Sequence, residues 1–230
     1  MRTAAILPVK RFSLAKQRLG ETVDDSLRAE LARAMVGDVL LALSRSSAID
    51  LTVVVTNEPS VAAAAGYVGA IVVPDTAEDG QSAAATIGIE RALSEGAERV
   101  LCVPGDCPAL DPDELNTLLD FETDPQPTGA TVVVVPDRHG TGTNGLLLTP
   151  PNAISPSFGP GSCERHRELA VAADARCRIE RPASLLLDID TGEDLAALRE
   201  RLAGERVHAP RTRAVLGLVE RHWQSSRPAA

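Results

Sequence analysis

The sequence predicts an α/β domain in which helices cover a mostly parallel sheet. Short runs rich in β-branched residues recur along the 230 residues, and several are apolar at consecutive positions, as in strands buried on both faces. Helical patterns separate these runs, and such alternation is typical of parallel sheets. A chain of this length can form one domain with a sizeable core.

The predicted strands are residues 4–9, 51–56, 70–73, 100–103, 131–135, 145–149 and 185–189. The first predicted helix, residues 24–45, has an apolar residue at every fourth position from Leu27 to Leu43. The other predicted helices are 81–95, 112–121, 164–173, 193–203 and a short one at 213–223. In this fold class ligands bind beyond the carboxyl ends of strands, so we look for chemistry in the loops that follow strands.

Composition and charge exclude several classes of protein. The net charge of −9 would repel a polyanion from most of the surface, so we expect no nucleic-acid partner. The four cysteines form no CxxC pair, and neither Cys102 nor Cys107 has histidine neighbours at zinc-like spacing, which favours free thiols in a reducing cytosol. The N-terminal apolar run is too short for a signal peptide, and glycines interrupt the longest apolar stretch, residues 61–73. We therefore expect a cytoplasmic protein with no membrane contact.

The first predicted strand runs into a cationic loop, PVKRFSLAKQRL, which contains both lysines of the chain, Lys10 and Lys16. With Arg18, they could neutralise a triphosphate, and the general acidity of the chain makes this cluster more notable. The alternative is a solvated basic turn. Because this loop matches neither GxxxxGK[ST] nor GxGxxG, the sequence argues against a kinase and against a Rossmann dehydrogenase.

Acidic residues follow two later strands. In PGDCP, Asp106 lies just beyond the strand at 100–103, and Asp188 and Asp190 are two apart on a segment predicted to be extended, so both point to one face. Such carboxylates suit Mg²⁺, which also binds substrate phosphates. The alternatives are turn capping by Asp106 and capping of the helix near residue 193 by Asp190 or Thr191. We expect Asp190 to serve both purposes.

Three polar loops complete the set. GTGTNG and FGPGSCERH are rich in Gly, Ser and Thr, and the second opens a helix, where backbone N–H groups and the Ser162 hydroxyl could bind an anion. The alternative is that these two segments are only flexible loops, which would have the same composition. EDGQS offers amide and hydroxyl groups for a base or ribose, although alone it indicates only a helix start. We find no Ser–His–Asp or Cys–His signature, so nucleophilic catalysis lacks support.

In chain order, the motifs are PVKRFSLAKQRL, EDGQSAA, PGDCPAL, GTGTNGLLL, FGPGSCERH and DIDTGEDL. This set resembles the phosphoenolpyruvate/2-phospho-L-lactate guanylyltransferases of coenzyme F-420 biosynthesis, nucleotidyltransferases with the molybdopterin-guanylyltransferase-like fold. Like that family, the chain lacks the GGxGxRMG opening of the wider superfamily. The resemblance implies a three-layer α/β/α, Rossmann-like nucleotidyltransferase domain with a mostly parallel mixed sheet at residues 1–212, followed by a C-terminal helix or tail at 213–230.

The resemblance also implies that GTP, with Mg²⁺, reacts with a small phosphorylated three-carbon acid to give a guanylated diphospho-acid and pyrophosphate. A phosphate oxygen is already nucleophilic at neutral pH, so positioning and charge neutralisation suffice and no general base is needed. The implied roles are catalysis and triphosphate binding for Lys10, Lys16 and Arg18; nucleoside binding for Gly80, Gln81 and Ser82; phosphoenolpyruvate binding for Thr143, Gly159 and Ser162; and Mg²⁺ binding for Asp106, Asp188 and Asp190.

The alternatives that stay open are another phosphorylated acceptor (2-phospho-L-lactate, 3-phosphoglycerate, a sugar phosphate or molybdopterin), a glycosyltransferase with a related metal site, and a non-catalytic GTP-binding domain. We expect phosphoenolpyruvate as acceptor, on the Arg-rich, Lys-poor composition and on family analogy. We expect a monomer or homodimer, with a downstream transferase that takes the unstable product directly as the further partner.

Overall fold

The computed structural model describes residues 1–12, 25–76, 78–120, 129–204 and 208–225. Across these residues one sheet has the strand order β3-β2-β1-β4-β6-β5-β7. Strand β6 is antiparallel to both its neighbours, and the other pairs are parallel, which confirms the mostly parallel mixed sheet. The bounds are β1 Thr3–Val9, β2 Leu51–Thr56, β3 Ile71–Val73, β4 Arg99–Cys102, β5 Thr131–Pro136, β6 Thr143–Thr149 and β7 Arg176–Ile179.

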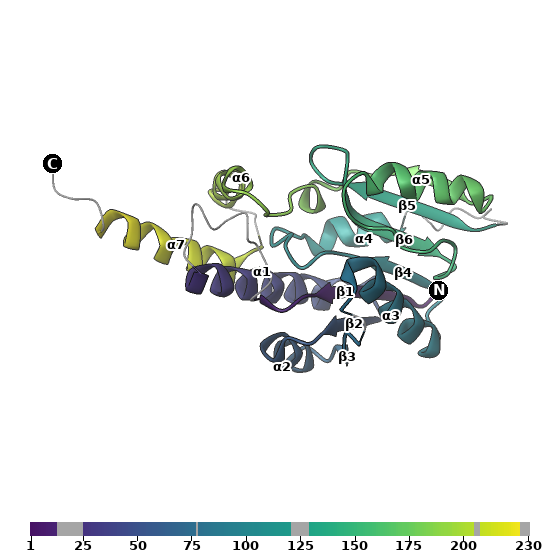
Figure 1. Ribbon diagram of the computed structural model, residues 1–230, viewed down its shortest axis with the longest axis horizontal. Helices are drawn as coiled ribbons and strands as arrows, with labels where there is room; N and C mark the ends of the chain where they lie inside the picture. Colours follow the sequence, from purple (N-terminus) through teal and green to yellow (C-terminus); the bar gives the residue numbers. More distant parts are fainter. Residues whose placement is uncertain (13–24, 77, 121–128, 205–207, 226–230) are drawn as a thin grey trace.

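Helices cover both faces of the sheet and make three layers (Figure 1). Alternate residues of β1 enter opposite cores, with Leu7 in the core on one face of the sheet and Ile6 in the core on the other. The helices are α1 Asp25–Arg45, α2 Pro59–Tyr67, α3 Gly80–Ser94, α4 Pro112–Asp120, α5 Ser162–Ala172, α6 Gly192–Leu202 and α7 Pro210–Ser225. A short 3₁₀ helix spans Ala183–Leu185.

The C-terminal helix α7 packs against α1 in a third apolar cluster that also includes α6 (Figure 1). The buried Asp38 of α1 accepts hydrogen bonds from the backbone N–H groups of Arg211 (3.1 Å) and Thr212 (2.8 Å), so it satisfies donors at the start of α7. Because α7 begins at Pro210, the predicted division between residues 212 and 213 falls within a helix. Residues 226–230 of the predicted tail lie outside the described residues.

All the predicted strands except the last are confirmed. Residues 185–189 are not a strand: Leu185 ends the 3₁₀ helix, and Leu187 and Ile189 pack against α1, α6 and α7 instead of entering the sheet. The seventh strand is β7, and α2 was not predicted. The four cysteines are free thiols, as expected. Within the described residues, no helix is long and apolar enough to span a membrane.

Candidate functional site

A cavity of about 330 Å³ opens beyond the carboxyl ends of β1, β3 and β4. Its polar lining comes from residues that follow these strands, from the start of α3 and from Asp190 before α6, while Val9, Ala32 and Met35 supply part of an apolar wall. The residues predicted from sequence that line it are Lys10, Gly80, Gln81, Asp106 and Asp190. The fold therefore brings the predicted phosphate, nucleoside and metal groups to one place.

Of the predicted cationic group, the structure places Lys10. Its side chain is exposed and lines the cavity directly after β1. Lys16 and Arg18 lie outside the described residues. In an acidic chain, a lysine at this edge of the sheet concentrates positive charge where a phosphate group could bind.

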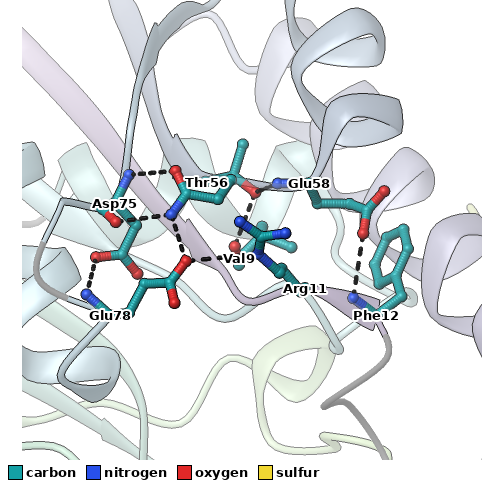
Figure 2. A network of polar contacts seen from close by, with 8 residues as sticks. Val9, Arg11, Phe12, Thr56, Glu58, Asp75 and Glu78 are labelled. Carbon is teal, nitrogen blue, oxygen red and sulfur yellow. Dashed lines mark hydrogen bonds and ion pairs between the residues drawn. The ribbon is translucent and has the colours of Figure 1, made fainter.

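A network of polar contacts fixes the end of β1 (Figure 2). The Thr56 hydroxyl donates to the Val9 carbonyl (2.8 Å) and accepts from the Glu58 N–H (3.0 Å). The Glu58 carboxylate then accepts from the Phe12 N–H (3.2 Å). Burial acts to raise the pKa of Glu58, but the hydrogen bonds from Phe12 and Ser60 outweigh it and lower the pKa. The segment that carries Lys10 is therefore fastened at both ends.

The same network continues to the loop before α3 (Figure 2). The Asn57 amide donates to the Asp75 carbonyl (2.8 Å) and the Glu78 carboxylate (2.6 Å), and it accepts from the Asp75 N–H (3.1 Å). Arg11 Nε lies 3.4 Å from Glu78 Oε1. These contacts hold Gly80 and Gln81 at the cavity. Asp75, which is 7% exposed, also lines the cavity. We did not predict this residue from the sequence, although its position soon after a strand could have indicated it.

The three predicted metal-binding carboxylates are neighbours. Asp106 and Asp190 both line the cavity, and the Ile189 N–H donates to the Asp106 carbonyl (3.1 Å), which joins the two segments. Burial, and then the nearby Asp106 carboxylate, raise the pKa of Asp188, and Asp190 adds to the effect. Asn144, which sequence reasoning did not single out, donates to Asp188 (3.1 Å) and to the Leu185 carbonyl (2.8 Å). A cation would relieve the repulsion within this group.

The chemistry of this donor set fits Mg²⁺ in part. Carboxylate oxygens are hard ligands, as Mg²⁺ requires, and this ion commonly takes one or two carboxylates together with substrate phosphates and water. Among the described residues, no three Asp, Glu, His or Cys side chains are arranged as a ready-made metal site. The three aspartates therefore suit a site that substrate phosphates complete.

The expected helix-capping role of Asp190 is wrong. Thr191 caps α6 in a capping box with Asp194: the Thr191 hydroxyl accepts from the Asp194 N–H (3.3 Å), and the Asp194 carboxylate accepts from the Thr191 N–H (2.7 Å). Thr191 and Asp194 together satisfy the helix start, so the Asp190 carboxylate remains at the cavity.

The predicted acid-binding residues form a second cluster at the start of α5. Thr143 opens β6 and Ser162 opens α5; both are buried, and the Ser162 hydroxyl donates to Thr143 Oγ1 (3.1 Å). Gly159 lies in the preceding loop with φ +112°, a conformation that favours glycine. Its carbonyl accepts from the Ser162 N–H (3.0 Å).

Ser82 connects this cluster to the cavity. Its hydroxyl, one residue beyond Gln81 on α3, accepts a hydrogen bond from the Phe158 N–H (2.8 Å). The helix start predicted to bind a nucleoside therefore also holds the loop that carries Gly159. A nucleotide bound in the cavity and an acid bound at the loop would therefore be neighbours.

Two consecutive residues of α5, which the sequence did not assign to the site, hold the same loop. Arg165 donates to the Ser157 hydroxyl (3.1 Å) and to the Ser157 and Pro160 carbonyls (3.0 and 2.5 Å). His166 is fully buried and contacts Thr143 and Ser157. Burial, and then the charge of Arg165, lower its pKa to about 4, so it is neutral at neutral pH. Their position just after a glycine-rich helix start was the only sequence signal.

Comparisons with known proteins agree with this geometry. The family model described as "Guanylyl transferase CofC like" matches residues 3–217. The chain is 46% identical to phosphoenolpyruvate guanylyltransferase of Conexibacter woesei, over 96% of this chain and 98% of that protein. It is 35% identical to the protein of the same name from Sphaerobacter thermophilus, over 91% and 95% of the two chains.

Solved structures share the fold at low sequence identity. A proposed nucleotide-diphospho-sugar transferase from Desulfovibrio desulfuricans superposes with a TM-score of 0.73 at 16% identity, covering 96% of this chain and 98% of that one. A nucleotidyl transferase from Methanothermobacter gives 0.61 at 19% identity, covering 88% and 98%. These neighbours confirm the nucleotidyltransferase fold expected from the sequence.

Proposed function

The chain belongs to the family of CofC-like guanylyl transferases, and we propose that it transfers GMP from GTP to phosphoenolpyruvate in coenzyme F-420 biosynthesis. The products would be a guanylated diphospho-acid and pyrophosphate. The names of the relatives at 46% and 35% identity support this acceptor. Pathway and donor follow from the family resemblance of the ordered motifs.

The observation that carries the proposal is the cavity with its neighbouring hydroxyl cluster. Lys10, Asp106 and Asp190 line one cavity with the start of α3, and Ser82 joins that helix to the loop of Gly159. A transfer between two phosphorylated molecules needs two adjacent anion sites, one of them next to carboxylates that suit a divalent cation.

In the proposed reaction a phosphate oxygen of phosphoenolpyruvate attacks the α-phosphorus of GTP. A bond forms between that oxygen and phosphorus, the bond between the α-phosphorus and its bridging oxygen breaks, and pyrophosphate leaves with the electron pair. The attacking oxygen carries no proton at neutral pH, so no base is required. Lys10 would stabilise charge on the triphosphate.

We assign the remaining predicted residues by the same resemblance. Lys16 and Arg18 would join Lys10 at the triphosphate, and Gly80, Gln81 and Ser82 would contact the nucleoside. Asp106, Asp188 and Asp190 would hold Mg²⁺, which when bound supplies neutralising charge on the phosphates. Thr143, Gly159 and Ser162 would bind the phosphate and carboxylate of the acid.

Further features concern partners and location. Four free cysteines support a reducing, cytoplasmic setting. A monomer or homodimer that passes its unstable product to a downstream transferase fits the proposed chemistry. The net charge of −9 supports small-molecule substrates instead of nucleic acid.

The test is pyrophosphate release from GTP and Mg²⁺ in the presence of phosphoenolpyruvate, 2-phospho-L-lactate, 3-phosphoglycerate, a sugar phosphate or no acceptor. We expect release that depends on the acceptor and is fastest with phosphoenolpyruvate. Preference for another acceptor would replace the substrate assignment. GTP binding without release under any condition would favour the non-catalytic domain.

A further inference from the structure

The side chain of His166 joins three segments that carry the proposed acid-binding residues. It projects from the first turns of α5, which Ser162 opens, and is 0% exposed. Its Nδ1 lies 3.0 Å from Thr143 Oγ1 at the start of β6, and its Nε2 lies 2.9 Å from the Ser157 nitrogen in the loop of Gly159. One imidazole ring therefore sets the spacing of the whole group.

The hydrogen bonds determine which nitrogen carries the proton. The Ser157 backbone N–H can only donate, so Nε2 accepts and is unprotonated. The ring is neutral at neutral pH because burial and Arg165 lower its pKa to about 4. Nδ1 therefore carries the proton and donates to Thr143 Oγ1.

This arrangement determines which hydrogen bonds the Thr143 hydroxyl accepts and where it can donate. Its oxygen accepts from His166 Nδ1 and from the Ser162 hydroxyl, which uses both lone pairs. The Thr143 O–H is then left to donate to a third group, as binding of a phosphate or carboxylate requires. The Phe158 ring packs edge-on against His166, with centroids 5.3 Å apart, and keeps the imidazole in this orientation.

We propose that His166 is a positioning residue for the acceptor acid: it holds Thr143 as a hydrogen-bond donor and fixes the Ser157–Ser162 loop at the distance that the acid requires. This inference rests on the proposed function. We place His166 in contact with neither substrate nor reacting atoms, and its effect reaches the acid through Thr143 and the loop. Its loss should therefore weaken use of the acid and leave use of GTP unchanged.

The test uses two variants of the full chain. His166→Asn retains a short amide that can donate toward Thr143, whereas His166→Phe keeps the ring and removes both hydrogen bonds. Arg167→Gln, at an exposed ion pair with Glu164 on the same helix, is the matched control. The measurements are KM for phosphoenolpyruvate at saturating GTP, KM for GTP at saturating phosphoenolpyruvate, kcat, and the thermal midpoint.

We expect KM for phosphoenolpyruvate to rise by about tenfold to a hundredfold in His166→Phe, with KM for GTP unchanged and partial recovery in His166→Asn. Arg167→Gln should match the wild type. Equal KM values for phosphoenolpyruvate in all folded variants would overturn the inference. So would an equal rise in both KM values, which a merely structural role would give.

A measurement on the wild-type protein covers the case in which the variants do not fold. Imidazole ¹H–¹⁵N spectra, assigned by replacing the other three histidines, should show His166 as the Nδ1–H tautomer, with signals that shift on adding phosphoenolpyruvate but not GTP alone. The opposite tautomer, or no response to the acid, would overturn the inference. If the wild type releases pyrophosphate with another acceptor only, the substrate assignment fails and the inference with it.

Discussion

Asp188 belongs to a group of three neighbouring carboxylates that concentrates negative charge at the site. It is partly buried, Asp106 and Asp190 lie close enough to raise its pKa, and Asn144 orients one of its oxygens. A fold keeps like charges together at a cost in stability, and that cost is offset when a cation binds. We therefore attribute this group of carboxylates to function and not to the stability of the fold.

Replacing one of these carboxylates should separate activity from stability. We expect Asp106→Asn to lower kcat at least about a hundredfold at saturating Mg²⁺, because it removes a negative charge from the proposed cation site. The thermal midpoint should be unchanged or raised, since Asp188 loses a repulsive neighbour. Pyrophosphate release and thermal unfolding measure the two quantities.

The matched control is Asp113→Asn, an exposed aspartate in the first turn of α4 that is not among the residues lining the cavity. It should leave kcat at the wild-type value. Wild-type kcat in Asp106→Asn at the same Mg²⁺ concentration would contradict the metal assignment.

At the scale of elements, the approach of α3 to the sheet depends on one glycine. A Cβ on Gly88 would overlap the Ile6 side chain of β1 and lie 3.1 Å from Val55 Cγ2 of β2. Since α3 begins with Gly80 and Gln81, this close packing also sets where the turn proposed to bind the nucleoside lies relative to β1.

We expect Gly88→Ala to destabilise the fold by about 1–3 kcal/mol, because the added methyl group overpacks the core. Gly66→Ala, in α2, is the control: nothing lies within 4 Å of its added Cβ, and the change should stabilise the helix by about 0.5–1 kcal/mol. Urea unfolding measures both. Equal free energies of unfolding for the two variants would contradict the packing argument.

The elements also show what the sequence could predict. The buried strands were found because their residues are apolar at consecutive positions. The edge strand β7, with the sequence RCRI and no fully buried residue, lacks that pattern and was missed. Residues 185–189 have the pattern of a strand, but their apolar side chains fill the space beside the sheet. The run of alanines in α2 has no periodicity that would indicate a helix.

Site residues could be predicted where the neighbouring residues in the sequence indicate their role. Asp106 follows a strand in a short turn, and Lys10 stands out in a lysine-poor chain. Asn144 and His166 were not assigned, because their roles arise from contacts between segments 44 and 23 residues apart, with Asp188 and Thr143 respectively. Only the tertiary structure reveals such contacts.

At the scale of the whole molecule, topology gathers the site. Parallel strands β1, β3 and β4 end at one edge, where their loops line the cavity. The antiparallel β6 begins at that same edge, because it runs opposite to β4, and so brings Thr143 and Asn144 beside the cavity. Structures at 16% and 19% identity share this fold. The fold alone therefore does not determine the substrate, which depends on the residues of the site.

In the proposed reaction the acceptor's phosphate oxygen attacks the α-phosphorus of GTP. The most direct measurement uses phosphoenolpyruvate whose non-bridging phosphate oxygens are ¹⁸O, with mass spectrometry of every product. We expect a guanylated product that retains all of the label, with unlabelled pyrophosphate formed in equal amount. Label in pyrophosphate, or GMP formed without the guanylated product, would contradict it.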